Sequence, residues 1–543
     1  MERRADIIVV GSGASAVHAA FPLVQAGWSV IMLDVGHDDQ RYRALIPPKS
    51  FAEIRRTDTA QHRYFLGEDL EGVPLGQMGA GPQITPPRQY VLRDSNRLGP
   101  IQSGKFAALE SFALGGLAQA WGAGCFPFLD TELRRCGLPV RELREHYEIV
   151  ARRIGVTGGR DDLAPLFGTL DTLQPPLELD QNAARIILRY EQLRNQLRER
   201  RIAVGQTLLA VLTQPLGNRG ANPYRDMDFW TNPADSVYRP DLTLCELRRY
   251  NNFHYLRPYL VEEFAEQADG DLTVQAIALS DKQRVLFRAQ RLVLGAGSFG
   301  TTRIVLRSLR KYDVPVAITC NPHSYVPCLN WGGLGQPPAD RCHSLAQLTM
   351  IYDRTADFEH LVQAQMFSYR SLLLFRLIKE LPFSYREALR VMHALSSAFV
   401  IWVVQHEDER TPGKTCVLRR GDSEGVDTLE VNYRLTKAEE RVCHDNEKRL
   451  MRTFLQLGCL PLKRVNPGLG SSVHYGGQLP FSTEDKPLTA ELSGRLRGTR
   501  GVYIADGATF GYLPAKGLTF TLMANANRIG TAVLLTLSGQ GHC

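Results

Sequence analysis

The residues best suited to chemistry stand at the beginning of the chain, where Gly11-Ser12-Gly13-Ala14-Ser15-Ala16 forms a GxGxxA turn. In such a turn the first glycine permits a tight bend, the second lets the backbone approach a pyrophosphate, and the small third residue allows close packing of a helix on a strand. A helix that begins at Ala14 and Ser15 would offer free backbone N–H groups to phosphate oxygens. Asp34 follows about twenty residues later, where an acid accepts hydrogen bonds from a ribose. The spacing predicts a dinucleotide site.

The elements around the turn fit that interpretation. Residues 7–10 form a short apolar run, as expected of a buried parallel strand, and residues 29–33 form a second one. Residues 17–26 have a helical pattern that stops at Gly27. The alternative is an ordinary strand–turn–helix unit that binds no ligand. The acid at the end of the second strand favours the nucleotide interpretation.

The composition is that of a globular protein with more than one domain. The chain has 543 residues, 44% of them hydrophobic and 22% charged, and this length exceeds what one ordinary core supports. The net charge is +7, but the arginines are scattered and no nucleic-acid-binding motif is present, so nucleic acid is not an expected partner. No uncharged apolar run reaches the roughly 18 residues of a transmembrane helix.

Cysteine usage and the position of the turn bear on location. The ten cysteines form no CxxC pair, which argues against a zinc ribbon or a redox dithiol, and no metal site is expected. Because the nucleotide motif begins so close to the first residue, we expect no secretory signal peptide. The expected location is the cytoplasm, with reduced thiols.

Further glycine-rich segments suggest contact with a flat ligand. Residues 112–124 combine glycines with apolar residues, so their backbone could lie against a planar group, although a glycine-rich turn under a helix is equally compatible. Residues 291–300 repeat the strand–glycine turn–helix pattern. Residues 501–507 read as a strand that ends in Asp506-Gly507.

The remaining segments predict ordinary elements. Residues 183–200 predict an amphipathic helix, residues 202–212 a strand, and residues 251–288 a small antiparallel sheet with a turn near 269–271. Residues 399–405 predict a buried strand, and residues 438–458 predict a helix that stops at glycine.

Residues 372–398 leave two interpretations open. They are apolar with interleaved arginine and lysine, and Pro382 should divide them into two helices. The pair could cover a core, or it could present a basic apolar face to a membrane surface or a partner protein. Core packing is favoured, because most amphipathic helices pack their apolar face on a core.

Four separated blocks together resemble the glucose–methanol–choline (GMC) family of FAD-dependent oxidoreductases. The blocks are GSGASA at 11–16, GGLAQAWG at 115–122, LVLGAGSFGTTRIVL at 292–306 and the tail from His474 to Met523. In motif style they are nearest to the pyranose-oxidase-like, sugar-oxidising branch.

The resemblance implies an α/β fold, α+β in part, with two domains. A discontinuous Rossmann-like FAD-binding domain would comprise residues 1–160, 225–310 and 490–543. A sheet-plus-helix substrate-binding domain would comprise residues 161–224 and 311–489.

The resemblance also implies how FAD would be held. The two turn glycines and Asp34 match the family's pyrophosphate and ribose positions, and Val261 matches a residue whose backbone meets the adenine. Ala120 stands where some members carry a histidine bonded to the flavin, so a noncovalent FAD is implied. The full expected set is Gly11, Gly13, Ala14, Ser15, Asp34, Gly115, Gly116, Trp121, Gly122, Val261, Ala296, Asp506, Gly507, Gly517, Leu518 and Thr519.

His474 matches the family's active-site histidine. An alcohol must lose its hydroxyl proton as hydride leaves its carbon for flavin N5, and an imidazole suits the role of base. The family's second histidine or asparagine is replaced by Gly517, next to Lys516. Lys516 could reach the substrate, or it could face solvent or pair with a carboxylate. The missing group could also come from the middle of the chain.

Three functions remain open on this basis. The first is FAD-dependent oxidation of an alcohol on a polyhydroxylated substrate such as a sugar, an aminosugar or a glycosylated metabolite, with O₂ or another acceptor taking the electrons. The second is a flavin-dependent mutase, isomerase or lyase. The third is a non-catalytic flavin-binding protein, because a fold alone does not establish a function.

Overall fold

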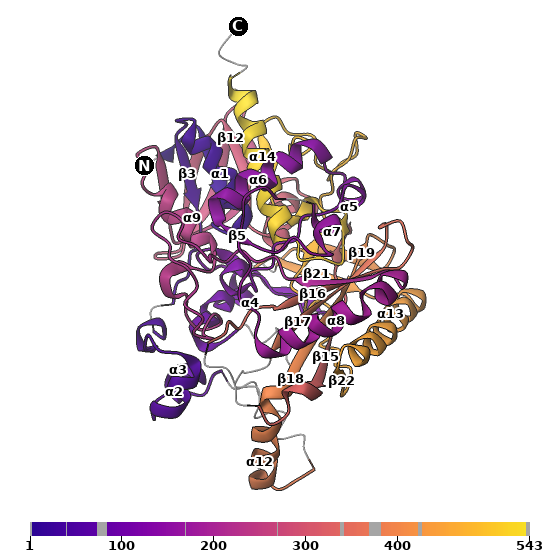
Figure 1. Ribbon diagram of the computed structural model, residues 1–543. Coiled ribbons are helices and arrows are strands. Elements are labelled where there is room, and N and C mark those ends of the chain that lie inside the picture. The colour runs from indigo at the N-terminus through magenta and orange to yellow at the C-terminus, as the bar shows by residue number, and fades with distance from the viewer. Residues whose placement is uncertain are drawn as a thin grey trace.

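The computed structural model describes residues 3–39, 41–72, 84–168, 170–268, 270–336, 341–368, 382–421 and 426–538. Two large sheets dominate them (Figure 1). One is a parallel sheet built around the start of the chain. The other is an antiparallel sheet built mostly from its middle. The α/β fold class predicted from the sequence is confirmed, whereas the domain boundaries stay a prediction.

The parallel sheet has five strands in the order β24-β12-β2-β3-β8. Every neighbouring pair in it is parallel. The strands β2, β3 and β12 are buried along their whole length, which explains why their sequences are apolar at every position except Arg291 at the start of β12. Their bounds are β2 Ile7–Val10, β3 Val30–Leu33, β8 Phe253–Leu256, β12 Arg291–Leu294 and β24 Val502–Ile504.

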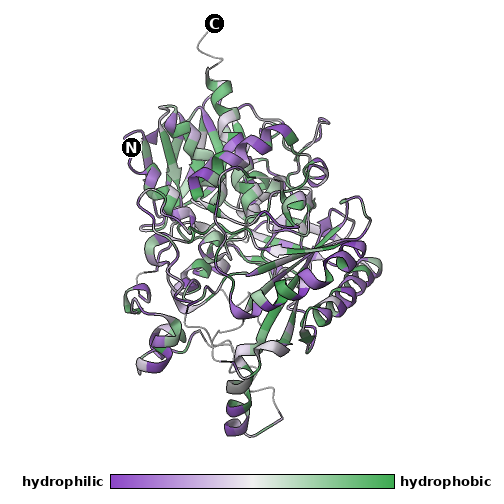
Figure 2. Ribbon diagram, in the orientation of Figure 1, coloured by the Kyte–Doolittle hydropathy of each residue, from purple (hydrophilic) through white to green (hydrophobic). Residues whose placement is uncertain are grey.

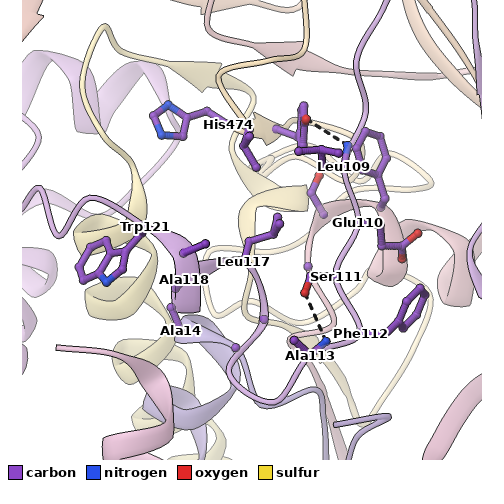
Figure 3. Close-up of a pocket in the computed structure, with 18 of the residues that line it drawn as sticks. Ala14, Leu109, Glu110, Ser111, Phe112, Ala113, Leu117, Ala118, Trp121 and His474 are labelled. Atoms are coloured by element: carbon purple, nitrogen blue, oxygen red, sulfur yellow. Dashed lines mark hydrogen bonds between the residues drawn. The ribbon is translucent and has the colours of Figure 1, made fainter. Parts of the chain in front are cut away.

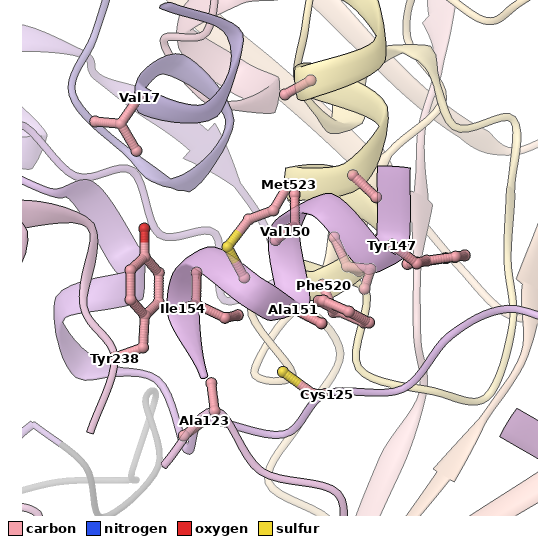
Figure 4. Packing of buried hydrophobic residues seen from close by; sticks show 14 of the residues in the cluster. Val17, Ala123, Cys125, Tyr147, Val150, Ala151, Ile154, Tyr238, Phe520 and Met523 are labelled. Carbon is pink, nitrogen blue, oxygen red and sulfur yellow. The ribbon is translucent and has the colours of Figure 1, made fainter. Parts of the chain in front are cut away.

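The two faces of this sheet are covered differently. Ile7 and Val9 face a core formed with helices α1, α6, α9 and α14, part of which appears in Figure 4. Ile8 and Val10 face a second core, formed with α10 and with a four-stranded sheet in the order β1-β11-β10-β9, in which β1 and β11 are parallel and the other pairs are antiparallel. The bounds are α1 Ala14–Gln25, α6 Val140–Ile154, α9 Pro240–Leu247, α10 Ser298–Ser308, α14 Thr519–Ser538, β1 Arg3–Arg4, β9 Tyr259–Glu266, β10 Leu272–Ala278 and β11 Gln283–Ala289.

The first and last helices cross in close contact. A Cβ atom added to Gly530 of α14 would lie 2.2 Å from the carbonyl oxygen of Ala19 in α1. Only glycine permits this approach, so α14 is fixed against the helix that begins at the GxGxxA turn.

Two predicted elements differ from the structure. Residues 251–288 do not form one antiparallel sheet, because β8 pairs with β3 and extends the parallel sheet, whereas β9 to β11 are antiparallel as expected. The strand predicted over 202–212 ends at Gln206, as β7 Ile202–Gln206. Beyond it the chain makes single bridges to other segments, among them Leu209 with Gly124.

The second large sheet has six strands in the order β22-β15-β18-β17-β16-β7, and all its pairs are antiparallel. One face of this sheet is covered by the helices α8 (Gln181–Glu199) and α13 (Lys437–Gln456), whose own outer surfaces are hydrophilic (Figure 2). Trp402 stacks on Phe454 there, with ring centroids 4.6 Å apart. The bounds are β15 His323–Asn330, β16 Leu348–Asp353, β17 Leu361–Ser368, β18 Phe399–His406, β22 Cys459–Pro461, α8 Gln181–Glu199 and α13 Lys437–Gln456.

Smaller elements complete the description. A four-stranded sheet has the order β13-β20-β21-β4. The bounds are β4 Ile101–Ser103, β13 Val316–Ala317, β20 Lys414–Arg419, β21 Thr428–Tyr433, β14 Thr319–Cys320, β23 Tyr475–Gly476, α2 Phe51–Thr57, α3 His62–Phe65, α4 Ser95–Leu98, α5 Asp130–Arg135, α7 Ala164–Phe167 and α12 Tyr385–Leu395.

Of the two helices predicted within 372–398, the second is present as α12, which begins with a capping box between Ser384 and Glu387. Its inner side packs on Phe399 through Ala388 and Met392. The predicted first helix, within residues 372–381, lies outside the described residues. Among the helices that are described, none is long and apolar enough to cross a membrane.

Candidate active site

The turn between β2 and α1 has the geometry that its sequence predicts. Gly11 has a φ of +92°, and a Cβ added to it would lie 2.6 Å from the carbonyl oxygen of Gly295. Glycine is therefore required at this position. Gly13 precedes α1 and gives it no side-chain cap, and Gly13, Ala14 and Ser15 line a cavity. The first N–H groups of α1 are thus available to an anionic ligand in that cavity.

Asp34 lines the same part of the cavity. Its carboxylate accepts hydrogen bonds from the Ser12 hydroxyl and, at 2.9 Å, from the Tyr255 hydroxyl. Burial raises the pKa of Asp34 to about 6, against the effect of these donors. Ser12 also accepts a hydrogen bond of 2.9 Å from the N–H of Gly115, which joins the turn to the glycine-rich segment.

A second helix start faces the cavity near the acid–glycine pair. Gly297 gives α10 no side-chain cap, and Gly297 and Ser298 line the cavity. Asp506 is buried, accepts hydrogen bonds from the Thr301 hydroxyl and from the N–H of Ala508, and has its pKa raised to about 6 by burial. The uncapped start of α10 and the buried Asp506 thus repeat the arrangement of α1 and Asp34.

The cavity that these elements share has a volume of about 1470 Å³. Pockets for single small ligands span roughly 300–1,000 Å³, so this one has room for a large ligand and a second molecule. The predicted cofactor residues that line it are Gly11, Gly13, Ala14, Ser15, Asp34, Gly116, Trp121, Gly122, Val261, Ala296, Asp506, Gly507, Gly517, Leu518 and Thr519.

Of the predicted cofactor residues, only Gly115 does not line the cavity. Its backbone instead supports the turn through Ser12. Trp121 does line the cavity, and its indole N–H donates to the carbonyl oxygen of Tyr238 at 2.8 Å. In the view of Figure 3, the rings of Trp121 and His474 lie on the left and the segment from Leu109 to Ala113 lies on the right.

His474 lies immediately before β23, with its ring at the cavity wall. Burial lowers the pKa of His474 to about 4, so the imidazole is neutral at neutral pH. Its Nδ1 atom lies 3.2 Å from the side-chain oxygen of Asn321 and 3.1 Å from Nε2 of Gln405. Within the described part of the chain the structure gives Nε2 of His474 no hydrogen-bond partner, which leaves it for a ligand.

The two amides around His474 are themselves fixed by backbone carbonyls. The Asn321 amide nitrogen donates to the carbonyls of His406 and Pro514, at 2.7 and 2.9 Å, so its oxygen must point toward His474. The Gln405 amide nitrogen donates to the carbonyl of Lys516 at 3.0 Å. Nδ1 can serve only one of them at a time. If it carries a proton, it donates to Asn321 and Nε2 keeps a lone pair; if it does not, it accepts from Gln405 and Nε2 carries the proton.

The six-stranded sheet supplies site residues that the sequence analysis did not identify. Side chains alternate along a strand, and the odd-numbered residues of β15, β17 and β18 face the cavity while the even-numbered ones face α8 and α13. Ser368, at the end of β17, is the exception and lines the cavity. The odd-numbered set that lines the cavity is His323, Tyr325, Pro327, Gln365, Phe367, Phe399, Ile401, Val403 and Gln405. Alternation of polar and apolar residues would have identified the cavity face from the sequence. In β18 apolar residues occupy both faces, so the alternation is not visible there.

The expectation that the Lys516 side chain reaches the substrate is wrong in this structure. Its ammonium group is fully buried and pairs with Glu132 at 2.8 Å, and it also donates to the carbonyl of Leu166 at 3.0 Å. The side chain does not line the cavity. Gly517 does line it, and a Cβ there would lie 3.3 Å from the ring of Phe126. Lys516 therefore has a structural role, the second of the two alternatives.

Comparison with solved structures finds pyridoxine 4-oxidase from Mesorbium loti, with a TM-score of 0.56 and 12% sequence identity. The superposition covers 97% of this chain and 98% of that one. The chain has the fold of this oxidase. No protein-family model matches the sequence, and no curated protein matches it. At this identity the likeness shows the fold alone, which agrees with the α/β fold expected from the motifs, and it gives no support to the sugar-oxidising branch.

Proposed function

We propose that the protein is an FAD-dependent oxidoreductase of the GMC type that oxidises an alcohol to the corresponding carbonyl compound. The observation that carries the proposal is a single cavity that begins at the uncapped start of α1 and ends at the neutral imidazole of His474. The likeness to a protein named as an oxidase supports it.

The chain's own groups fit FAD. The uncapped starts of α1 and α10 supply N–H donors for a pyrophosphate, and Asp34 supplies an acceptor for a ribose hydroxyl. Bound FAD would supply the hydride acceptor. Ala120, at the position where a histidyl attachment would occur, has only a methyl side chain, so FAD is held without a covalent bond there.

His474 would act on the alcohol's proton. With Asn321 accepting from Nδ1–H, the lone pair of Nε2 takes the hydroxyl proton of the substrate as the hydrogen of the carbinol carbon departs with its electron pair. The O–H and C–H bonds break, and the C=O bond forms. The two electrons leave later to O₂ or to another acceptor.

The expected polyhydroxylated substrate gains no support from the wall of the cavity. On the sheet, most of the polar side chains that line the cavity lie toward His474, whereas Phe367, Phe399 and Ile401 line it farther away. A buried sugar needs a partner for each hydroxyl group. The proposal therefore specifies an alcohol and not a sugar.

The test is the visible spectrum of the purified protein, mixed anaerobically with a panel of alcohols. Lasting bleaching of the flavin by an alcohol, with the carbonyl product detected, is expected. Conversion of substrate without bleaching would favour a mutase, isomerase or lyase instead. Flavin that no alcohol reduces would favour a non-catalytic protein. Acid precipitation should release yellow flavin into solution, and colour kept in the pellet would contradict noncovalent binding.

A further inference from the structure

The cavity face of the six-stranded sheet is ordered in rows that run across its strands. His323 pairs with Gln405, which pairs with Gln363 on its other side, and this is the row next to His474. The second row is Tyr325, Val403 and Gln365, the third is Pro327, Ile401 and Phe367, and the fourth is Leu329 and Phe399. Because a row advances by two residues, successive rows are about 7 Å apart.

Polarity falls along these rows. The first row carries an imidazole and two amides, and the second carries one amide and one phenol. The third has no polar side chain, and beyond it Ser368 is the remaining polar residue of these strands that lines the cavity. Burial lowers the pKa of His323 to about 3, so the first row is neutral as well as polar. None of the side chains in the four rows is charged at neutral pH. Lys463 lines the same cavity from the segment after β22, off the strand face.

The far end of the rows is closed by α12. Phe399 of the fourth row packs with Ala388 and Met392 of α12, and Leu329 and Ile401 pack against the same cluster. The distance from the first row to the third is about 13 Å. A ligand whose hydroxyl lies at His474 would therefore place the rest of its length along apolar side chains.

The near end is flanked by a further aromatic ring. A Cβ added to Gly124 would lie 2.7 Å from the ring of Phe126 and 3.5 Å from the amide nitrogen of Gln365. Gly124, Phe126 and Gln365 therefore lie close together, and all three line the cavity. Phe126 also lies beside Gly517, which follows the Lys516 carbonyl that Gln405 contacts.

We infer that the substrate is a neutral alcohol with one hydroxyl end and an elongated apolar body, alkyl or aromatic, that lies along the second and third rows toward α12. The inference rests on the proposed function and names the substrate class of the same site. Tyr325, Phe367, Ile401 and Val403 are its specificity residues, because they form the surface on which that body packs.

The experiment measures anaerobic flavin reduction in the FAD-loaded full chain with primary alcohols of increasing alkyl length, an aryl-alkyl alcohol, hexoses and aminosugars. Each buried methylene should raise the efficiency of reduction about fourfold until the chain reaches α12. Sugars should be at least a hundredfold less efficient than the best alcohol. Efficiency that does not depend on length, or sugars that match the longest alcohols, would overturn the inference.

A pair of tryptophan substitutions tests the rows. Ile401→Trp fills the third row and should lower the efficiency for long alcohols at least tenfold more than that for short ones. Leu535→Trp is the matched control, since Leu535 is exposed on α14, and it should leave the length dependence unchanged. Ile401→Ala is the second variant, should the tryptophan disturb folding, and it should shift the preference toward bulkier alcohols. Unchanged length preference in every folded Ile401 variant would contradict the assignment.

The outcomes separate this inference from the proposed function. If sugars bleach the flavin and apolar alcohols do not, alcohol oxidation stands and the substrate class is wrong. If no alcohol of either kind reduces the bound flavin, the proposed function fails and the substrate class fails with it.

Discussion

The side-chain oxygen of Asn321 lies 3.2 Å from Nδ1 of His474, although the two residues are 153 positions apart in the chain. Because two backbone carbonyls fix the Asn321 amide, its oxygen can only accept from Nδ1–H. The contact therefore favours the tautomer in which Nε2 is a base. Gln405, on the other side of the ring, favours the opposite tautomer.

This relationship predicts unequal effects of two substitutions. Asn321→Leu should slow flavin reduction by about 10²-fold, because the ring then turns its lone pair to Gln405 and misplaces its proton. Gln405→Leu leaves Asn321 as the partner and should slow reduction less. Stopped-flow reduction with a saturating alcohol measures both. Equal losses in the two variants would contradict the assignment of tautomers.

His474 itself is predicted to be the base. His474→Ala should retain FAD and slow reduction by about 10²–10⁴-fold, the range for a lost general base. In the unsubstituted protein the base is active when unprotonated, so reduction should be constant around neutral pH and fall as the pH drops through about 4. Single-turnover reduction across this pH range is the measurement. Normal reduction in His474→Ala would remove the histidine from the mechanism.

FAD retention is predicted to depend on the charge of Asp34. A ribose hydroxyl donates best to an ionised carboxylate, and burial raises the pKa of Asp34 to about 6. Affinity for FAD should thus be highest above that pH and decrease as the pH falls through it. Asp34→Asn should bind FAD about tenfold to a hundredfold more weakly and lose this pH dependence. Fluorescence titration of the apoprotein measures both, and a pH-independent affinity in the unsubstituted protein would refute the role of Asp34.

Lys516 is predicted to stabilise the fold and not to take part in the chemistry. Lys516→Met leaves the buried Glu132 carboxylate without its cation and should lower the free energy of unfolding by about 3–5 kcal/mol. Combining it with Glu132→Gln should restore much of the loss. Chemical denaturation measures stability, and stopped-flow reduction of the folded fraction should be near normal. A folded Lys516→Met variant with slow reduction would revive the catalytic interpretation.

How far the sequence predicts this protein depends on what fixes each residue. The turn at Gly11 was predictable because steric contact with Gly295 admits no other residue. The strands β2 and β3 were predictable because both faces of the parallel sheet are covered, so every position in them is apolar. His323 and Gln365 were not predictable, because strand pairing between distant segments brings them to the cavity. Lys516 was misjudged because nearness to Gly517 in the sequence says nothing about side-chain direction.

The pairing of β12 has a consequence for the synthesis of the chain. This strand lies between β2, near the beginning, and β24, which begins at Val502. While the ribosome makes the intervening residues, one side of β12 has no neighbour, and α1 lacks the helix that packs on it. An open apolar edge of this kind invites association with other nascent chains. Production of the protein should therefore improve at low translation rates or with added chaperones, and truncations before β24 should be insoluble.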